Sequence, residues 1–317
     1  MIKPFDRNHT TEMRAVYAQT LIDMMSKNKD VVIMDADLVS ASGTKKVFDA
    51  FPKQSINMGI AEANMMGVAG GLSLSGKIPY VHTFAPFATR RAYDQIYLSG
   101  AYQQANFRIL GSDPGYWAAH NGGTHTSVED LALMRVIPTM NVLVPADAVA
   151  LKWMLHYTGK AYGMFYIRMG RKDYVDLYQE DATFELGKVN VLSEGKDGVI
   201  FAIGEMVAEA MDAAMIVKQQ FNLDVAVVDV FSLKPLDKEG IIKQSHNKKF
   251  VITAENHSII NGLASAVSEV LVENKNHPPL RKVAINDRFG EVGTIDYLSK
   301  TYQVNAENIV KAIKEFI

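Results

Sequence analysis

Short runs of apolar, β-branched residues alternate along the first half of the chain with longer segments whose apolar residues recur at helical spacing. The runs predict strands at residues 31–34, 78–83, 107–111, 141–144 and 164–168. The segments between them predict helices at residues 10–25, 61–73, 87–102, 128–136 and 146–156. Strands that are apolar on both faces are typical of parallel sheets covered by helices on both sides, so we expect such a sheet here.

The second half repeats this alternation on a smaller scale. It predicts a helix at residues 206–221 and strands at residues 199–204, 225–230, 251–254 and 283–285. Residues 171–196 are polar and irregular, and they predict a linker. Because 317 residues exceed the size of most single cores, we expect an α/β fold of two tandem domains, at residues 1–185 and 186–317. Each should be a mostly parallel sheet covered by helices.

Composition and charge argue against several classes of partner. A net charge of -2, with no run of Lys and Arg, gives no electrostatic footprint for nucleic acid or an anionic membrane. The absence of cysteine excludes disulfides and thiolate ligands and is consistent with a reducing cytoplasm. The first residues lack the apolar core of a secretion signal, and no stretch approaches the roughly 20 apolar residues of a membrane span. We therefore expect a cytoplasmic protein.

One acidic residue, Glu62, lies among small and apolar residues in the segment 56–67, where an extended stretch is expected to become a helix. Burial disfavours a charged carboxylate, so Glu62 could stay protonated and donate a hydrogen bond. Alternatively, backbone N–H groups and the dipole at the helix N-terminus could satisfy an ionised Glu62. The residues alone leave both interpretations open.

Loops at the C-terminal ends of parallel strands form the ligand sites of such sheets. Motifs in and around these expected loops, and one at the beginning of the first helix, occur in the same order as in transketolase. These motifs are Met13-Arg14, Asp35-Ala36-Asp37-Leu38, Gly59-Ile60-Ala61-Glu62-Ala63-Asn64-Met65, Thr83-Phe84-Ala85-Pro86-Phe87, Gly122-Gly123-Thr124-His125, Val144-Pro145-Ala146-Asp147 and Tyr166-Ile167-Arg168. The chain thus resembles transketolase from its pyrimidine-binding domain to its C-terminus, which implies the thiamine diphosphate-binding fold followed by a transketolase C-terminal-like domain.

The resemblance implies roles around the cofactor, thiamine diphosphate. The glutamate that matches Glu62 hydrogen-bonds a ring nitrogen of the aminopyrimidine and so activates the cofactor, which suits a protonated carboxyl group. Phe87 matches the ring that stacks on the pyrimidine, and Phe84 matches a residue lining its pocket. Asp37 matches a carboxylate near the cofactor. The structural alternatives are that the phenylalanines belong to the core and that Asp37 caps a turn.

The resemblance also implies contacts with the substrate, a sugar phosphate. His125 matches a histidine near the reacting hydroxyl or carbonyl, where an imidazole can bind and transfer a proton. Arg168 and Arg14 match arginines that grip the phosphate, for which a guanidinium offers a planar, charged fork. A structural histidine and a surface ion pair of Arg14 are the corresponding alternatives.

Three positions depart from the family pattern near the substrate. Asp113 stands in a loop where transketolases often carry a histidine, and we expect it to contact substrate. Asn121 replaces an aspartate four positions before His125, and Arg90 replaces an aromatic residue three positions after Phe87. These departures leave the preferred sugars unpredicted.

A missing motif predicts a partner. Thiamine diphosphate is anchored in this family through a metal bound at a Gly-Asp-Gly motif, and hard cations need such oxygen ligands. The chain has no such motif, so we expect no metal ligand in it. We expect instead the C-terminal subunit of a split transketolase, active only with an N-terminal subunit that carries the pyrophosphate-binding domain and holds Mg²⁺ or Ca²⁺. An α2β2 complex, with homodimerisation of this chain, would then transfer a two-carbon ketol unit between sugar phosphates.

Other functions compete with this interpretation. The β subunits of 2-oxo acid dehydrogenases share the architecture and the glutamate, and deoxyxylulose phosphate synthase shares a segment similar to residues 91–95. A non-catalytic scaffold subunit could also retain the fold. In a split transketolase the second domain would serve mainly in packing and dimerisation. Residues 255–257 are its best candidate for anything more, although we expect a structural role for them.

Overall fold

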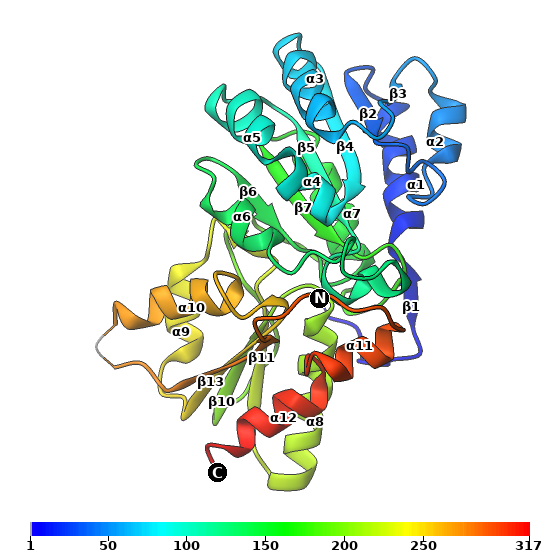
Figure 1. The fold of residues 1–317 in the computed structure, drawn as a ribbon. Coiled ribbons are helices and arrows are strands. Elements are labelled where there is room, and N and C mark those ends of the chain that lie inside the picture. The colour runs from blue at the N-terminus through cyan, green and yellow to red at the C-terminus, as the bar shows by residue number, and fades with distance from the viewer. Residues whose placement is uncertain (1, 275) are drawn as a thin grey trace.

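Two sheets organise the chain, and helices cover both faces of each sheet (Figure 1). The computed structural model describes residues 2–274 and 276–317, so Met1, the first residue of the predicted first domain, lies outside the described residues. Within these ranges no helix is long and apolar enough to cross a membrane. The predicted architecture of two tandem, mostly parallel sheets is confirmed, whereas the boundary between residues 185 and 186 stays a prediction.

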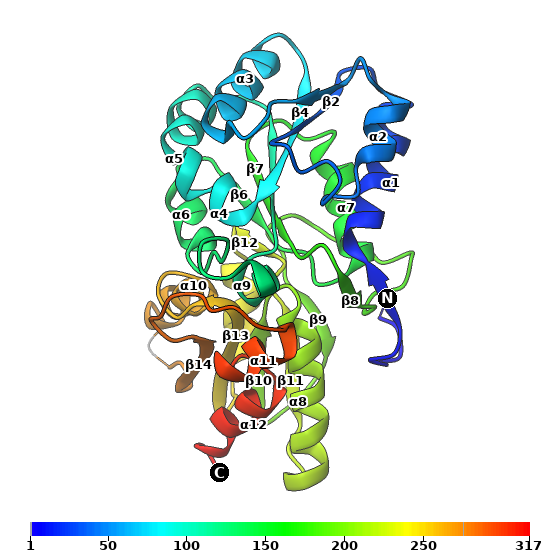
Figure 2. The same cartoon turned by 45° about the vertical axis from the view of Figure 1, so that its right-hand side comes forward.

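The first sheet has seven strands in the order β12-β6-β7-β5-β4-β2-β3. Its strands are β2 (Val31–Asp35), β3 (Ser55–Asn57), β4 (Ile78–Phe84), β5 (Arg108–Ser112), β6 (Asn141–Leu143), β7 (Phe165–Met169) and β12 (Ser232–Lys234). All are parallel to their neighbours except β12, which comes from the second half of the chain and pairs antiparallel with β6. Figure 2 shows two helical layers on this sheet, comprising α1 (Met13–Met25), α2 (Lys45–Ala50) and α7 (Ala148–Thr158) on one side and α3 (Glu62–Leu74), α4 (Ala85–Ala88), α5 (Tyr93–Gln95) and α6 (Asp130–Val136) on the other.

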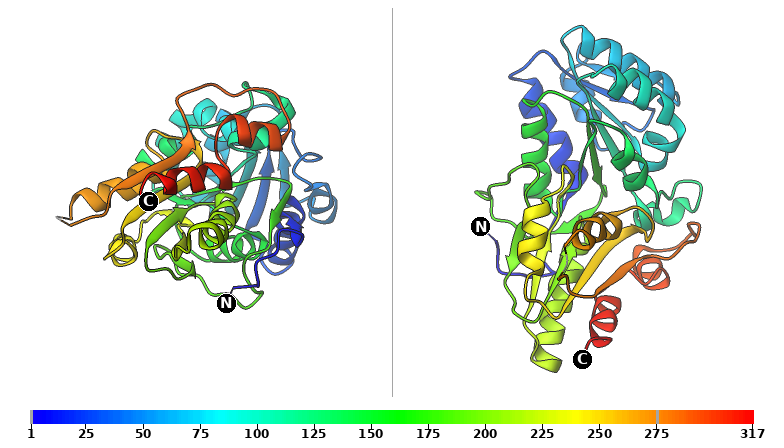
Figure 3. Two further views of the ribbon diagram at one scale, coloured as in Figure 1. Left: turned by 90° about the horizontal axis from the view of Figure 1, so that it is seen from below. Right: turned by 90° about the vertical axis from the view of Figure 1, so that its left-hand side faces the viewer.

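The second sheet has five strands in the order β14-β13-β10-β11-β9. They are β9 (Asn190–Ser193), β10 (Gly198–Ala202), β11 (Val225–Asp229), β13 (Phe250–Ser258) and β14 (Leu280–Ile285). Only β9 runs antiparallel to its neighbour. The helices are α8 (Met206–Phe221), α9 (Lys238–Ser245), α10 (Leu263–Val272), α11 (Ile295–Thr301) and α12 (Ala306–Lys314). The red α12 lies beside the yellow-green α8 in both views of Figure 3.

Three predicted elements differ from those observed. Residues 10–12 are not helical but form β1 (Thr10–Glu12), which pairs with β8 (Asp173–Val175) in the segment expected to be a linker. The predicted helix 87–102 is broken into α4, η1 (Arg90–Ala92), α5 and η2 (Ile96–Tyr102). The first interruption falls at Thr89, whose backbone leaves the helical region with φ of -105° and ψ of -88°. Between the predicted strand 107–111 and the predicted helix 128–136, where no element was predicted, the structure has the 3₁₀ segment η3 (Gly115–Asn121).

Candidate active site

Glu62 opens α3, directly after a turn in which Gly59 has a left-handed φ of 68°. Its side chain is only 3% exposed, although it is acidic. Its Oε1 accepts a hydrogen bond of 2.9 Å from Nη1 of Arg91, and the two groups form an ion pair. The partner of Glu62 is therefore a cationic side chain, which neither interpretation of the sequence included.

Arg91 also lies over an aromatic ring of the site, that of Phe87. The central carbon of its guanidinium is 3.8 Å from the centroid of the Phe87 ring, which is a close cation–π contact. The imidazole of His125 lies edge-on to the same ring, with centroids 5.1 Å apart, and 5.7 Å from the ring of Phe84. The structure thus brings four of these groups together: a buried carboxylate, two phenyl rings and an imidazole.

His125 is half-buried at the end of a loop that follows β5. Its Nδ1 lies 2.9 Å from the hydroxyl of Thr124. Arg90, at the position where an aromatic residue was expected, donates to the carbonyl of Thr124 at 3.3 Å and to Glu129 at 2.8 Å. Arg90 therefore supports the backbone beside His125 from η1.

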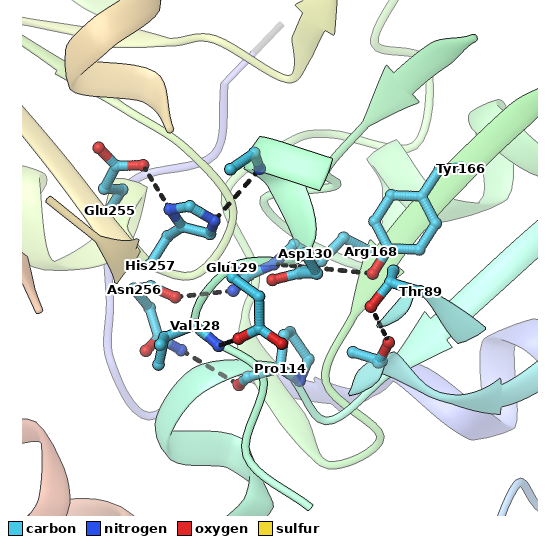
Figure 4. A network of polar contacts seen from close by, with 12 residues as sticks. Thr89, Pro114, Val128, Glu129, Asp130, Tyr166, Arg168, Glu255, Asn256 and His257 are labelled. Carbon is cyan, nitrogen blue, oxygen red and sulfur yellow. Dashed lines mark hydrogen bonds and ion pairs between the residues drawn. The ribbon is translucent and has the colours of Figure 1, made fainter. Parts of the chain in front are cut away.

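Arg168 lies inside β7 and is fully buried, at 1% exposure (Figure 4). Its Nε donates to Asp130 at 2.8 Å and its Nη2 to the backbone carbonyl of Asn256 at 2.7 Å. Burial lowers the pKa of Arg168, but the carboxylates of Asp130 and Glu205 together raise it above its usual value, so the guanidinium stays charged. The expected phosphate contact of Arg168 stays a prediction that this geometry does not favour, because its Nε and Nη2 take part in a buried link between the two halves of the chain.

Arg171, three positions later and beyond the end of β7, lies at the site instead. Its Nε donates to Asp113 at 2.6 Å and its Nη1 to the carbonyl of Ala41 at 3.1 Å, and its guanidinium covers the ring of Phe84 at 4.8 Å. Arg14 approaches the same carbonyl of Ala41, at 3.5 Å. Two guanidinium groups thus converge beside the aromatic cluster, which consists of Phe84, Phe87 and His125. The sequence signal that we missed is position, since only the later arginine follows the strand end, where ligand loops begin.

The two aspartates named from the sequence have other partners. Asp113 is buried and holds Arg171 through both of its carboxylate oxygens, at 3.0 and 2.6 Å. Asp37 is exposed, and its backbone is in the left-handed region, with φ of 63°. Its backbone N–H donates to the side-chain oxygen of Asn57 at 3.1 Å, and its carboxylate accepts from the Asn57 amide at 3.2 Å. The placement of Asp37 matches its structural alternative, a residue of the turn. Asn121 is also exposed, at the end of η3.

Comparison with known proteins gives the family. Residues 9–175 match the pyrimidine-binding domain of transketolase, and residues 187–309 match the transketolase C-terminal domain. The 6-deoxy-6-sulfo-D-fructose transketolase subunit of Clostridium sp. (strain MSTE9) is 43% identical over 303 residues, which cover 96% of this chain and 94% of the relative. An apulose-4-phosphate transketolase subunit from Phocaeicola vulgatus is 32% identical, over 98% of this chain and 99% of the relative.

A solved structure gives the same result. It is described as a split gene transketolase in an inactive β4 tetramer, and it is similar with a TM-score of 0.89 and 41% identity over 96% of this chain and 98% of its own. The fold and these matches define an α/β protein of the class that joins a pyrimidine-binding domain to a transketolase C-terminal domain. The chain belongs to the transketolase family, as a C-terminal subunit of the split-gene kind. The predicted family is confirmed, and the family implies thiamine diphosphate as the cofactor.

The residues present fit the pyrimidine end of that cofactor. The Arg91 guanidinium is a flat group that donates to Glu62 and stacks on Phe87. An aminopyrimidine is also flat and carries N–H groups and ring nitrogens at its edge. The space between Glu62 and Phe87 therefore has the shape and the hydrogen-bonding partner that such a ring requires.

Proposed function

We propose that this chain and an N-terminal subunit together form a thiamine diphosphate-dependent transketolase, which transfers a two-carbon ketol unit from a ketose phosphate to an aldose phosphate. The observation that supports this most is the buried carboxylate of Glu62. It accepts a hydrogen bond from the guanidinium of Arg91, and the same guanidinium lies over the ring of Phe87. The N-terminal subunit would hold the pyrophosphate and its Mg²⁺ or Ca²⁺, in an α2β2 complex.

Each residue of the aromatic cluster has a proposed role. Glu62 hydrogen-bonds a ring nitrogen of the aminopyrimidine and Phe87 stacks on its face, so that cofactor binding displaces Arg91 from this place. Phe84 lines the adjacent wall. When bound, thiamine diphosphate supplies the nucleophilic carbon that accepts the two-carbon unit. His125 hydrogen-bonds the substrate near its reacting oxygen and can exchange a proton with it near neutral pH.

Arg171 and Arg14 are the proposed anion-binding residues. Both reach the carbonyl of Ala41, and charged, planar guanidinium groups bind tetrahedral anions through pairs of N–H donors. Asp113 orients Arg171 rather than touching substrate. The names of the relatives include a sulfonated and a phosphorylated sugar. A phosphate and a sulfonate are both tetrahedral anions, so this arginine pair suits either group.

The test mixes this chain with an N-terminal subunit, thiamine diphosphate and Mg²⁺. Two-carbon transfer to ribose 5-phosphate is assayed with xylulose 5-phosphate and, in parallel, with 6-deoxy-6-sulfofructose as donor. We expect activity in the mixture, none from this chain alone, and a loss of at least about a hundredfold with Glu62→Ala. Glu269→Ala, which breaks an exposed ion pair with Arg135, is the control and should leave activity unchanged. Activity that survives Glu62→Ala would contradict the proposal.

A further inference from the structure

The loop that carries His125, defined here as residues 113–127, is held at its beginning by the second half of the chain. Asn256 lies in β13, and its side-chain oxygen accepts the backbone N–H of Tyr116 at 3.1 Å. Its amide donates to the carbonyl of Pro114 at 3.4 Å (Figure 4). A β-carbon at Gly115 would lie 2.1 Å from that side-chain oxygen, so only glycine leaves room for this contact.

The other end of the loop packs against the segment 290–293, which connects β14 to α11. A β-carbon at Gly290 would lie 2.4 Å from the side chain of Thr126, and one at Gly123 would lie 2.7 Å from the carbonyl oxygen of Gly290. Val292 fills the space beside Gly122 in the same way, 2.7 Å from where a β-carbon would be. The segment therefore packs closely on Gly123 and Thr126, the residues on either side of Thr124 and His125. Figure 2 shows this orange-red segment passing along the green η3.

The backbone of the loop is strained between these two contacts. Ala119 has φ of 46° and ψ of -116°, a conformation that non-glycine residues adopt only when their surroundings impose it. Its carbonyl accepts the backbone N–H of Gly293 from the segment 290–293. The loop thus depends on contacts from outside its own sequence to hold its shape.

The contact residue Asn256 is itself fixed in place. Its backbone carbonyl accepts the buried guanidinium of Arg168, and its side-chain amide donates to Glu205. A group that packing and hydrogen bonds already hold in one geometry can hold its neighbours with little further loss of entropy. Arg168 therefore acts on the site indirectly, by securing the strand end that carries Asn256.

We infer that the C-terminal domain positions His125 for the reaction, through Asn256 at the beginning of the His125 loop and through Gly290 at its end. This inference rests on the proposed function, because it assigns His125 to substrate. It gives the C-terminal domain a part in the active site beyond packing. Asn256 and Gly290 are positioning residues, since neither needs to touch substrate.

The test uses two variants and a matched control. Gly290→Ala places a β-carbon against Thr126, and Asn256→Asp keeps the shape of the side chain but removes the donor to Pro114 and to Glu205. Gly198→Ala is the control, because its β-carbon would lie 2.2 Å from the ring of Phe250, within the same domain but away from the His125 loop. Hydrogen–deuterium exchange of peptides within residues 113–127 is measured on the full chain. Transfer kinetics are measured on the complex with the N-terminal subunit.

Both variants should speed exchange in the His125 loop by about tenfold or more, whereas the control should not. They should lower kcat/KM for the ketose donor by about tenfold to a hundredfold, and the half-saturating concentration of thiamine diphosphate should stay unchanged. Three results would each overturn the inference. The first is exchange in the His125 loop that is unchanged in the two variants, and the second is exchange that is equally fast in Gly198→Ala. The third is faster exchange in the two variants with an unchanged kcat/KM. A wild-type complex without transketolase activity would refute the proposed function instead, and loop exchange would still decide whether the domain holds the loop.

Discussion

Arg168 and Arg171 are three positions apart, yet one is buried in an ion pair and the other lies beside the aromatic cluster. The partners of Arg168, Asp130 and Asn256, are 38 and 88 positions away in the sequence. Because the choice of which arginine is buried depends on these distant residues, a local motif could not reveal it. The same holds for Arg91, whose partner Glu62 is 29 positions away in the sequence.

Removing the buried guanidinium should cost stability. Arg168→Met leaves Asp130 buried without its counter-charge, which is expected to lower the free energy of unfolding by about 3 to 5 kcal/mol. Chemical denaturation measures this loss. Arg135→Met breaks the more exposed pair with Glu269 and should cost less than about 1 kcal/mol. Equal losses in the two variants would show that Arg168 has no special structural role.

Removing the second guanidinium should affect the substrate instead. Arg171→Ala deletes a charged donor to the anionic group of the sugar, which is expected to raise KM for the ketose donor by about tenfold to a hundredfold. The affinity for thiamine diphosphate should not change, because Glu62 and Phe87 are untouched. Steady-state kinetics of the reconstituted complex measure both values, and an unchanged KM would refute the assignment of Arg171.

Among the elements, β11 ends in a buried acidic group. Asp229 is completely buried and accepts a hydrogen bond from the hydroxyl of Tyr178 at 2.8 Å. Burial raises the pKa of Asp229 well above its usual value, although the Tyr178 hydroxyl partly opposes this. The folded protein therefore holds this proton to a higher pH than the unfolded chain does. The stability that Asp229 contributes is complete below about pH 4 and is lost as the pH rises towards its folded-state pKa.

Asp229→Asn should remove this pH dependence, because asparagine can still accept the Tyr178 hydroxyl and carries no proton to lose. The stability of the variant relative to wild type should grow by about 1.4 kcal/mol for each pH unit above pH 4, until the folded-state pKa is passed. Unfolding measured from pH 4 to pH 9 gives this slope. Asp49→Asn, at an exposed position of α2, is the control. Parallel pH profiles for Asp229→Asn and wild type would contradict the assignment.

The sequence predicted elements well where burial is uniform. β2, β5 and β7 are buried at every position, and each lies within one or two residues of the predicted strand. The sequence-based prediction missed elements that depend on a distant partner strand. β1 exists because it pairs with β8, and β12 leaves the second half to pair with β6, and neither short strand has a hydrophobic pattern of its own.

At the scale of the whole molecule, large apolar side chains are exposed on α3 (Figure 1) and on the neighbouring η2, in the helical layer that covers one face of the first sheet. They are Leu74, Tyr97, Leu98 and Tyr102. Exposed apolar groups gathered on adjacent elements mark a surface for association. This surface is our candidate for the homodimerisation expected from the sequence.

Charges at this surface should separate the copies. Leu98→Glu with Tyr102→Glu is expected to shift the isolated chain to a smaller species in sedimentation, because two like charges would face their own copies across the contact. Val272→Glu alters a similarly exposed apolar residue on α10, in the second half of the chain, and should leave the assembly unchanged. An unaltered assembly in the double variant would exclude α3 and η2 as the contact.

The most direct test of the central claim, that Glu62 of this chain activates a cofactor anchored by another chain, is the exchange of the thiazolium C2 proton. Thiamine diphosphate, Mg²⁺ and both subunits are mixed in deuterated buffer, and the loss of the C2 proton is followed by NMR after acid quenching. Wild-type chain with its partner should exchange this proton at least about a hundredfold faster than the free cofactor, and Glu62→Ala should lose the acceleration. Equal acceleration with Glu62→Ala, or from the N-terminal subunit alone, would contradict the account.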